Sequence, residues 1–169
     1  CLGAAFLSLG ELEKALHHID MGVSLNPYFP NTIMNRGLVI CFSGRHAEGL
    51  AIIERAAALE PRLPPAMRGH YLDVHCMLGN ADLAQGAFDH IDNATAFQHL
   101  MLAATLAGAG SRNEARRALA AFEARRTPWF DVRAFVQAKC NQYRLPEDRA
   151  RLLDGFRKLG FEVEDTGDI

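Results

Sequence analysis

Gly10-Glu-Leu-Glu-Lys-Ala15 recurs along the chain as Gly44-Arg-His-Ala-Glu-Gly49, Gly79-Asn-Ala-Asp-Leu-Ala84 and Gly110-Ser-Arg-Asn-Glu-Ala115. Each copy has a glycine, a short polar run and a small residue five positions after the glycine. The steps from Gly10 to Gly44, Gly44 to Gly79 and Gly79 to Gly110 are 34, 35 and 31 residues. A nearly fixed period of this length is typical of helical repeat arrays, in which each unit buries its apolar face against its neighbours.

Two further landmarks share the period. Leu25-Asn26-Pro27 is matched 34 residues later by Leu59-Glu60-Pro61, and Gly3 by Gly37. Apolar residues at three- and four-residue spacing predict helices between these points, and no stretch alternates as a strand would. The predicted helices after the first unit cover 31–43, 46–59, 81–92, 95–108, 112–125 and 130–141, and a last one begins at Glu147 and ends before Gly160.

Composition limits the classes of function. The 169 residues suffice for one domain with a sizeable core, and a net charge of −2 gives no bulk attraction to nucleic acid or to an anionic membrane. The longest apolar runs are far shorter than a membrane span. The four cysteines form no CxxC pair and fit no zinc spacing, so we expect no metal, no cofactor and a reducing cytoplasm. Because the chain starts at Cys1 inside a helix-like stretch, we expect it to be a fragment or to lack its true N-terminus.

A helix-turn-helix unit of roughly 34 residues resembles the tetratricopeptide repeat, TPR. The tryptophan of the family's pattern is absent, and Ile33 stands at its position in the second unit. The resemblance implies an all-α, TPR-like α-α superhelix with units at about 1–29, 30–64, 65–93 and 94–127, a capping helix pair at 128–161 and a frayed tail at 162–169. It rests on residues of all four units: Gly3, Phe6, Gly10, Ala15, Ile19 and Pro27; Gly37, Ile40, Gly44, Gly49, Ile53, Ala56 and Pro61; Gly79, Ala84 and Phe88; and Gly110, Ala115, Leu119 and Phe122.

The C-terminal part carries a second, looser resemblance. Pro128-Trp129-Phe130-Asp131-Val132 and the stretch 144–160 look like the tail of bacterial TPR proteins whose repeats follow a class III adenylate cyclase or winged-helix DNA-binding domain. This likeness implies a regulatory module of a signalling protein. Neither partner domain is within the chain, so no catalytic residue is carried over.

The TPR resemblance implies that the first helix of each unit lines a concave groove. Two alternatives stand beside it: these residues pack only between helices, or the C-terminal helices fill the groove. We expect a non-enzymatic interaction module that binds a protein or peptide, with self-association as a further option. The predicted groove residues are Met34, Asn35, Leu38, Phe42, His70, Asp73, Met77, Phe97 and Met101.

Overall fold

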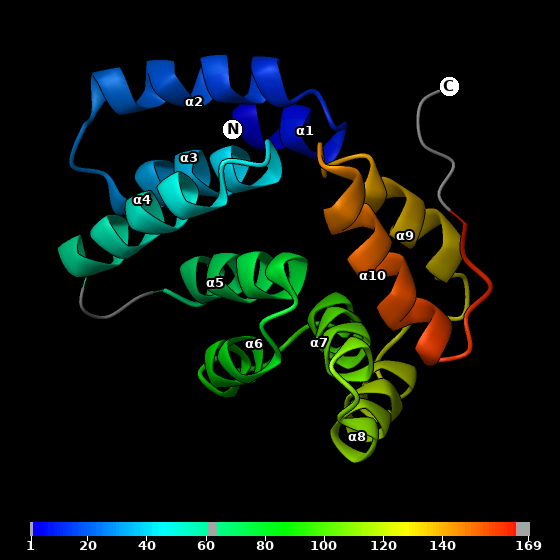
Figure 1. Cartoon of the computed structure of the whole chain (residues 1–169). Helices are drawn as coiled ribbons and strands as arrows, with labels where there is room; N and C mark the ends of the chain where they lie inside the picture. The colour runs from blue at the N-terminus through cyan, green and yellow to red at the C-terminus, as the bar shows by residue number, and fades with distance from the viewer. Residues whose placement is uncertain (1, 61–63, 165–169) are drawn as a thin grey trace.

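The computed structural model of the chain describes residues 2–60 and 64–164, and within them it contains ten α-helices and no strand (Figure 1). The all-α prediction is therefore confirmed. Pro61 and the tail residues 165–169, for which the sequence suggested a helix stop and fraying, lie outside the described part. The helices are α1 (Leu2–Ser8), α2 (Leu12–Leu25), α3 (Pro30–Phe42), α4 (His46–Leu59), α5 (Pro65–Leu78), α6 (Ala81–Asp89), α7 (Ala96–Gly108), α8 (Arg112–Glu123), α9 (Val132–Cys140) and α10 (Pro146–Lys158).

The recurring glycines form the turns between paired helices. Gly10, Gly44, Gly79 and Gly110 have φ angles of 75°, 88°, 71° and 87°, in the left-handed region that glycine enters without a Cβ penalty. They join α1 to α2, α3 to α4, α5 to α6 and α7 to α8. The prediction that the four copies are equivalent turns is thus confirmed.

Small residues let the two helices of a pair approach closely, as the sequence predicts. A Cβ on Gly37 of α3 would lie 2.8 Å from the backbone oxygen of Gly49 in α4 and 2.7 Å from Ile53 Cγ1. Ala15 and Ala84, at the positions equivalent to Gly49, are fully buried in the second helices of their pairs. A larger side chain at these positions would force each pair apart.

One predicted boundary is wrong. The sequence predicts a helix over 81–92, whereas α6 ends at Asp89. The chain turns directly afterwards, and Asn93 takes a left-handed φ of 56°, which asparagine tolerates better than most residues. This shorter second helix accounts for the short step from Gly79 to Gly110.

The helices α1 to α8 follow an arc, and α9 and α10 lie across its open side (Figure 1). Within the arc α3 packs on α5 and α5 on α7, and α10 packs on both α5 and α7. Gly155 of α10 permits this packing, because a Cβ there would lie 2.8 Å from the carbonyl carbon of Ala104 in α7. The C-terminal helices therefore occupy the inner side of the array.

The C-terminal segment also caps three helices of the arc. The N–H of Arg144 donates to Phe42 O at the end of α3 (2.9 Å), Arg151 Nη1 to Met77 O near the end of α5 (2.9 Å) and Lys158 Nζ to Gly108 O at the end of α7 (3.0 Å). The three donors are seven residues apart. Arg151 and Lys158 lie in α10, where seven residues rise about 10 Å, close to the 8–10 Å between packed helices, so this helix reaches the C-terminal ends of both α5 and α7.

A buried carboxylate fastens α10 to the array. The Asp148 side chain is 0% exposed and accepts from Arg151 Nη1 and lies against His46 Nε2, both at 2.8 Å. His46 belongs to the first turn of α4 and Arg151 to α10. A buried charge of this kind is stable only while its partners are in place. None of the helices in the two described ranges is long and apolar enough to cross a membrane.

Candidate functional site

Five of the nine predicted groove residues are buried in the core. Met34, Leu38, Phe42, Met77 and Met101 are at most 4% exposed. The prediction that they line an open groove is therefore corrected: they pack between helices, as one of the two alternatives required.

The C-terminal helices provide part of this cover. The ring of Tyr143 meets the ring of Phe42 edge to face at 5.0 Å, and Lys139 Nζ lies 5.9 Å from the centre of the Phe42 ring. Tyr143 itself is fully buried. At Phe42 the side chain is therefore both packed between helices and covered by the C-terminal part of the chain.

The other four predicted residues keep some exposure. Asn35 is half-buried, and its amide donates to Asn31 O one turn earlier at 2.7 Å. His70 and Asp73 are half-buried on α5, and Phe97 is 49% exposed on α7. Asn35 therefore serves its own helix, and the remaining three lie where α5 faces α7.

A cavity of about 410 Å³ joins three of the predicted residues. Asp73, Phe97 and Met101 line it together with Thr95, Gln98, Phe135 and Lys139. The cavity lies between α5, α7 and α9, and we refer to it as the Phe97 pocket. A concave site with an apolar lining and a few polar groups is the usual form of a binding site.

Local sequence signals position the walls of the pocket. Thr95 and Gln98 form a capping box at the start of α7: Gln98 N–H donates to Thr95 Oγ1 (3.3 Å), and Thr95 N–H donates to Gln98 Oε1 (2.8 Å). Asp131 caps α9 by accepting from the N–H groups of Arg133 and Ala134 at 2.8 and 3.2 Å.

These caps fix where each pocket residue stands. The first places Phe97 and Gln98 in the opening turn of α7. The second starts α9 so that Phe135 and Lys139, four residues apart, share one face. The sequence reasoning missed Thr95, Gln98, Phe135 and Lys139, although the Thr-x-x-Gln pattern was visible.

The apolar wall of the pocket consists of phenyl rings. Phe97 and Phe135 are stacked, with ring centroids 5.6 Å apart and an interplanar angle of 19°. Phe130 contacts both, at 5.3 and 5.6 Å, and Phe122 contacts Phe130 at 5.5 Å. Trp129, beside Phe130 in the chain, is 82% exposed. Of these aromatic residues Phe97 and Trp129 are exposed, and exposed aromatic side chains are common at contact sites for other molecules.

The polar side of the pocket contains one ion pair. Lys139 Nζ lies 3.7 Å from Asp73 Oδ1, and the two side chains are 16% and 29% exposed. Burial lowers the pKa of the neighbouring His70 below its usual value, against the opposing effect of Asp73. His70 is therefore neutral at neutral pH, and Asp73 and Lys139 are the charged groups of this region.

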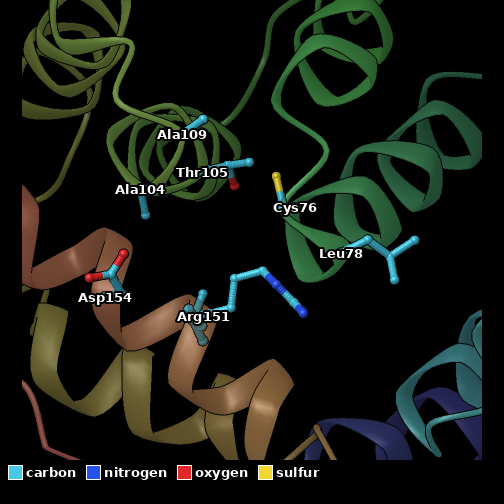
Figure 2. A pocket seen from close by; sticks show the side chains of 10 residues that line it. Cys76, Leu78, Ala104, Thr105, Ala109, Arg151 and Asp154 are labelled. Atoms are coloured by element: carbon cyan, nitrogen blue, oxygen red, sulfur yellow. The ribbon is translucent and has the colours of Figure 1, made fainter.

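A smaller hollow of about 190 Å³ lies where α5, α7 and α10 meet (Figure 2). Arg151 and Asp154 reach it from α10, Thr105 from α7 and Cys76 from α5. The polar groups are already engaged, because Arg151 bonds to Met77 O and Asp148, and Asp154 pairs with Lys158 at 2.7 Å. This hollow therefore belongs to the cap interface.

Another hollow, of about 510 Å³, separates α5 from α6 and is lined by Tyr71, His75, Leu83, Gly86 and others. Gly86 borders open space there, since a Cβ at that position would meet nothing within 4 Å. In the described part of the chain no group of three His, Cys, Asp or Glu side chains is arranged to hold a metal ion.

The Phe97 pocket is thus the place where predicted inner-face residues, aromatic surface and charge meet. Comparison of this chain with protein-family models, with curated proteins and with solved structures gives no match.

Proposed function

We propose that the chain is a non-enzymatic protein-interaction module, built as a TPR-like helical array, that binds a partner peptide at the Phe97 pocket. The proposal rests on one observation: the stacked rings of Phe97 and Phe135 line a cavity that also contains the Asp73–Lys139 ion pair. A large aromatic side chain left 49% exposed at a cavity gains from burial against a partner.

The arrangement of the helices supports the TPR-like part of the proposal. Four helix pairs turn at left-handed glycines with a period of 31 to 35 residues, and a C-terminal pair covers the inner side. Such arrays are rigid scaffolds, so a partner would bear most of the ordering cost on binding. The pocket is built from α5, α7 and α9 alone, and the proposal does not depend on any domain upstream.

The chemistry of the cysteines supports a binding role over nucleophilic catalysis. Burial raises the pKa of the Cys41 and Cys76 thiols to about 12, so neither forms a thiolate at neutral pH. Both thiols are free and buried, which suits the reducing cytoplasm that we propose as the location.

Selection from a random-peptide display library against the immobilised chain tests the proposal. We expect selected peptides to bind with a measurable Kd that Phe97→Ala strongly weakens, because the apolar contact of the ring is lost without any change in charge. Leu83→Ala is the matched control, since Leu83 is a similarly exposed (56%) apolar residue on α6. Equal loss in both variants, or no loss in either, would refute the Phe97 pocket as the binding site.

A further inference from the structure

The two charged side chains of the Phe97 pocket differ in their exposure. The Asp73 side chain is 29% exposed and the Lys139 side chain 16%. In the described part of the chain Asp73 accepts no hydrogen bond, and its ion-pair contact with Lys139 is long, at 3.7 Å. Since a carboxylate can accept about four hydrogen bonds, Asp73 keeps most of its acceptor capacity for another group.

Lys139 has a second contact besides Asp73. Its ammonium lies 5.9 Å from the centre of the buried Phe42 ring, within range of a cation–π contact. Both charged side chains line the pocket, and the carboxylate of Asp73 is the more exposed of the two.

Two phenyl rings lie beside Asp73. The rings of Phe97 and Phe135 stack on each other, and both line the same cavity as Asp73. A guanidinium group is planar, stacks on aromatic faces and binds a carboxylate through two parallel N–H···O bonds.

We propose that the Phe97 pocket binds an arginine side chain of the partner peptide. The guanidinium pairs with Asp73, and its face or its methylene stem lies on the Phe97–Phe135 wall. The side-chain NH2 group of Gln98 then donates to a carbonyl of the peptide backbone. The side-chain oxygen of Gln98 already accepts from the N–H of Thr95, so the NH2 group is the part of the amide that can bind the peptide. This inference rests on the proposed function and specifies which side chain the pocket selects.

Other side chains fit the same groups less well. A glutamate would be repelled by Asp73, which is more exposed than Lys139. A norleucine would cover Asp73 without donating a hydrogen bond to it, which costs desolvation of the carboxylate. A lysine would supply the charge but not the planar group that matches both the rings and the carboxylate.

The test uses one pocket-directed peptide from the display selection, resynthesised with arginine, lysine, citrulline, norleucine or glutamate at each position in turn. Binding is measured by isothermal titration calorimetry, and amide shifts of Phe97 and Gln98 in NMR spectra show whether the peptide occupies the pocket. At one position we expect arginine to bind about tenfold or more tightly than citrulline, the difference that a charged hydrogen-bonded pair typically makes.

Three variants of the chain separate the contributions. Asp73→Asn should remove most of the preference for arginine over citrulline. Asp82→Asn is the same change in the hollow between α5 and α6, and it should leave that preference intact. Phe97→Leu keeps an apolar surface but removes the ring, so it should weaken the arginine peptide roughly two- to fivefold and the norleucine peptide less. The Phe97 residue is half exposed, so this variant keeps the test valid if Asp73→Asn perturbs the fold.

The outcomes distinguish this inference from the function on which it rests. If arginine and citrulline bind equally at every position, or if glutamate binds best, the inference is wrong while a peptide-binding pocket stands. If display yields no peptide whose binding Phe97→Ala weakens, both are wrong. A preference for arginine that Asp73→Asn and Asp82→Asn leave equally unchanged would also overturn the pairing with Asp73.

Discussion

Gly155→Ala should destabilise the chain, although alanine favours a helix. Gly155 lies within α10, where replacing glycine by alanine gains about 1 kcal/mol of helix propensity. The added Cβ would lie 2.8 Å from the carbonyl carbon and 3.3 Å from Cα of Ala104. Carbon atoms pack at about 3.5–4.0 Å, so α10 must move away from α7 by roughly 1 Å.

The cost of that movement exceeds the propensity gain. The atoms in the way belong to the backbone of α7, which cannot change rotamer, and Leu152, Leu153 and Phe156 are buried on the same helix. Overpacking of a core costs about 1–3 kcal/mol, and a rigid backbone obstacle places this case at the upper end. We therefore expect a net loss of about 2 kcal/mol in the free energy of unfolding.

Gly86→Ala is the matched control. Gly86 also lies inside a helix, α6, and a Cβ there would meet nothing within 4 Å. This variant should gain about 1 kcal/mol, so the two alanine variants should differ by about 3 kcal/mol. Urea unfolding followed by far-UV circular dichroism measures both midpoints, and equal slopes would show that only stability has changed.

If Gly155→Ala stabilises the chain as much as Gly86→Ala, the reasoning fails. Helix α10 would then not lie against α7. The inner side of the array would be open, and buried residues such as Met34 and Phe42 would again be candidates for partner contact.

Three further predictions follow from buried polar groups. Asp148→Ala removes a fully buried carboxylate from His46 and Arg151, and Arg151 keeps its bond to Met77 O, so thermal melts should show a loss of about 2 kcal/mol; an unchanged Tm would contradict the burial of Asp148. The thiols of Cys41 and Cys76, whose pKa burial raises to about 12, should resist iodoacetamide at mildly alkaline pH and react at once in denaturant; rapid labelling of the native chain would show that they are accessible. Burial lowers the pKa of His70 and His75 below 6.5, so the unfolded chain binds more protons than the folded chain between the lowered values and 6.5. The free energy of unfolding should therefore fall as pH drops through that window, and its pH profile should be flatter in His→Gln variants. Equal pH profiles would contradict the assignment.

The helix pairs could be predicted from the sequence because their signals are local. A left-handed turn requires glycine, so Gly10, Gly44, Gly79 and Gly110 mark the turns by residue type alone. Apolar periodicity then gives the helices between them. The end of α6 was predicted three residues too late, because Ile91 continues the apolar spacing of Phe88 beyond Asp89, where the helix ends.

The openness of the inner face could not be predicted in the same way. The repeat register shows which side of α3 faces inward, but not what covers it. Phe42 is covered by Tyr143, a residue far along the chain, and only tertiary packing brings the two together. The spacing of Arg144, Arg151 and Lys158 is visible in the sequence, yet its meaning depends on knowing the distance between the helix ends that they cap.

Part of the candidate site was nevertheless within reach of sequence reasoning. Asp73 and Phe97 were predicted on the inner face, and both line the pocket. Phe135 and Lys139 were not, because the sequence assigned 128–161 to a cap and gave no reason to place its first helix against α5 and α7. The pocket exists only because the cap and the array share it.

A crystal structure of the chain with a display-selected peptide is the measurement that best tests the Phe97 pocket as the binding site. We expect the peptide to lie on Phe97 and Phe135, with α9 and α10 in place and Met34 still buried. A peptide lying against Met34 and Leu38 with α10 displaced, or one seated between α5 and α6, would contradict it.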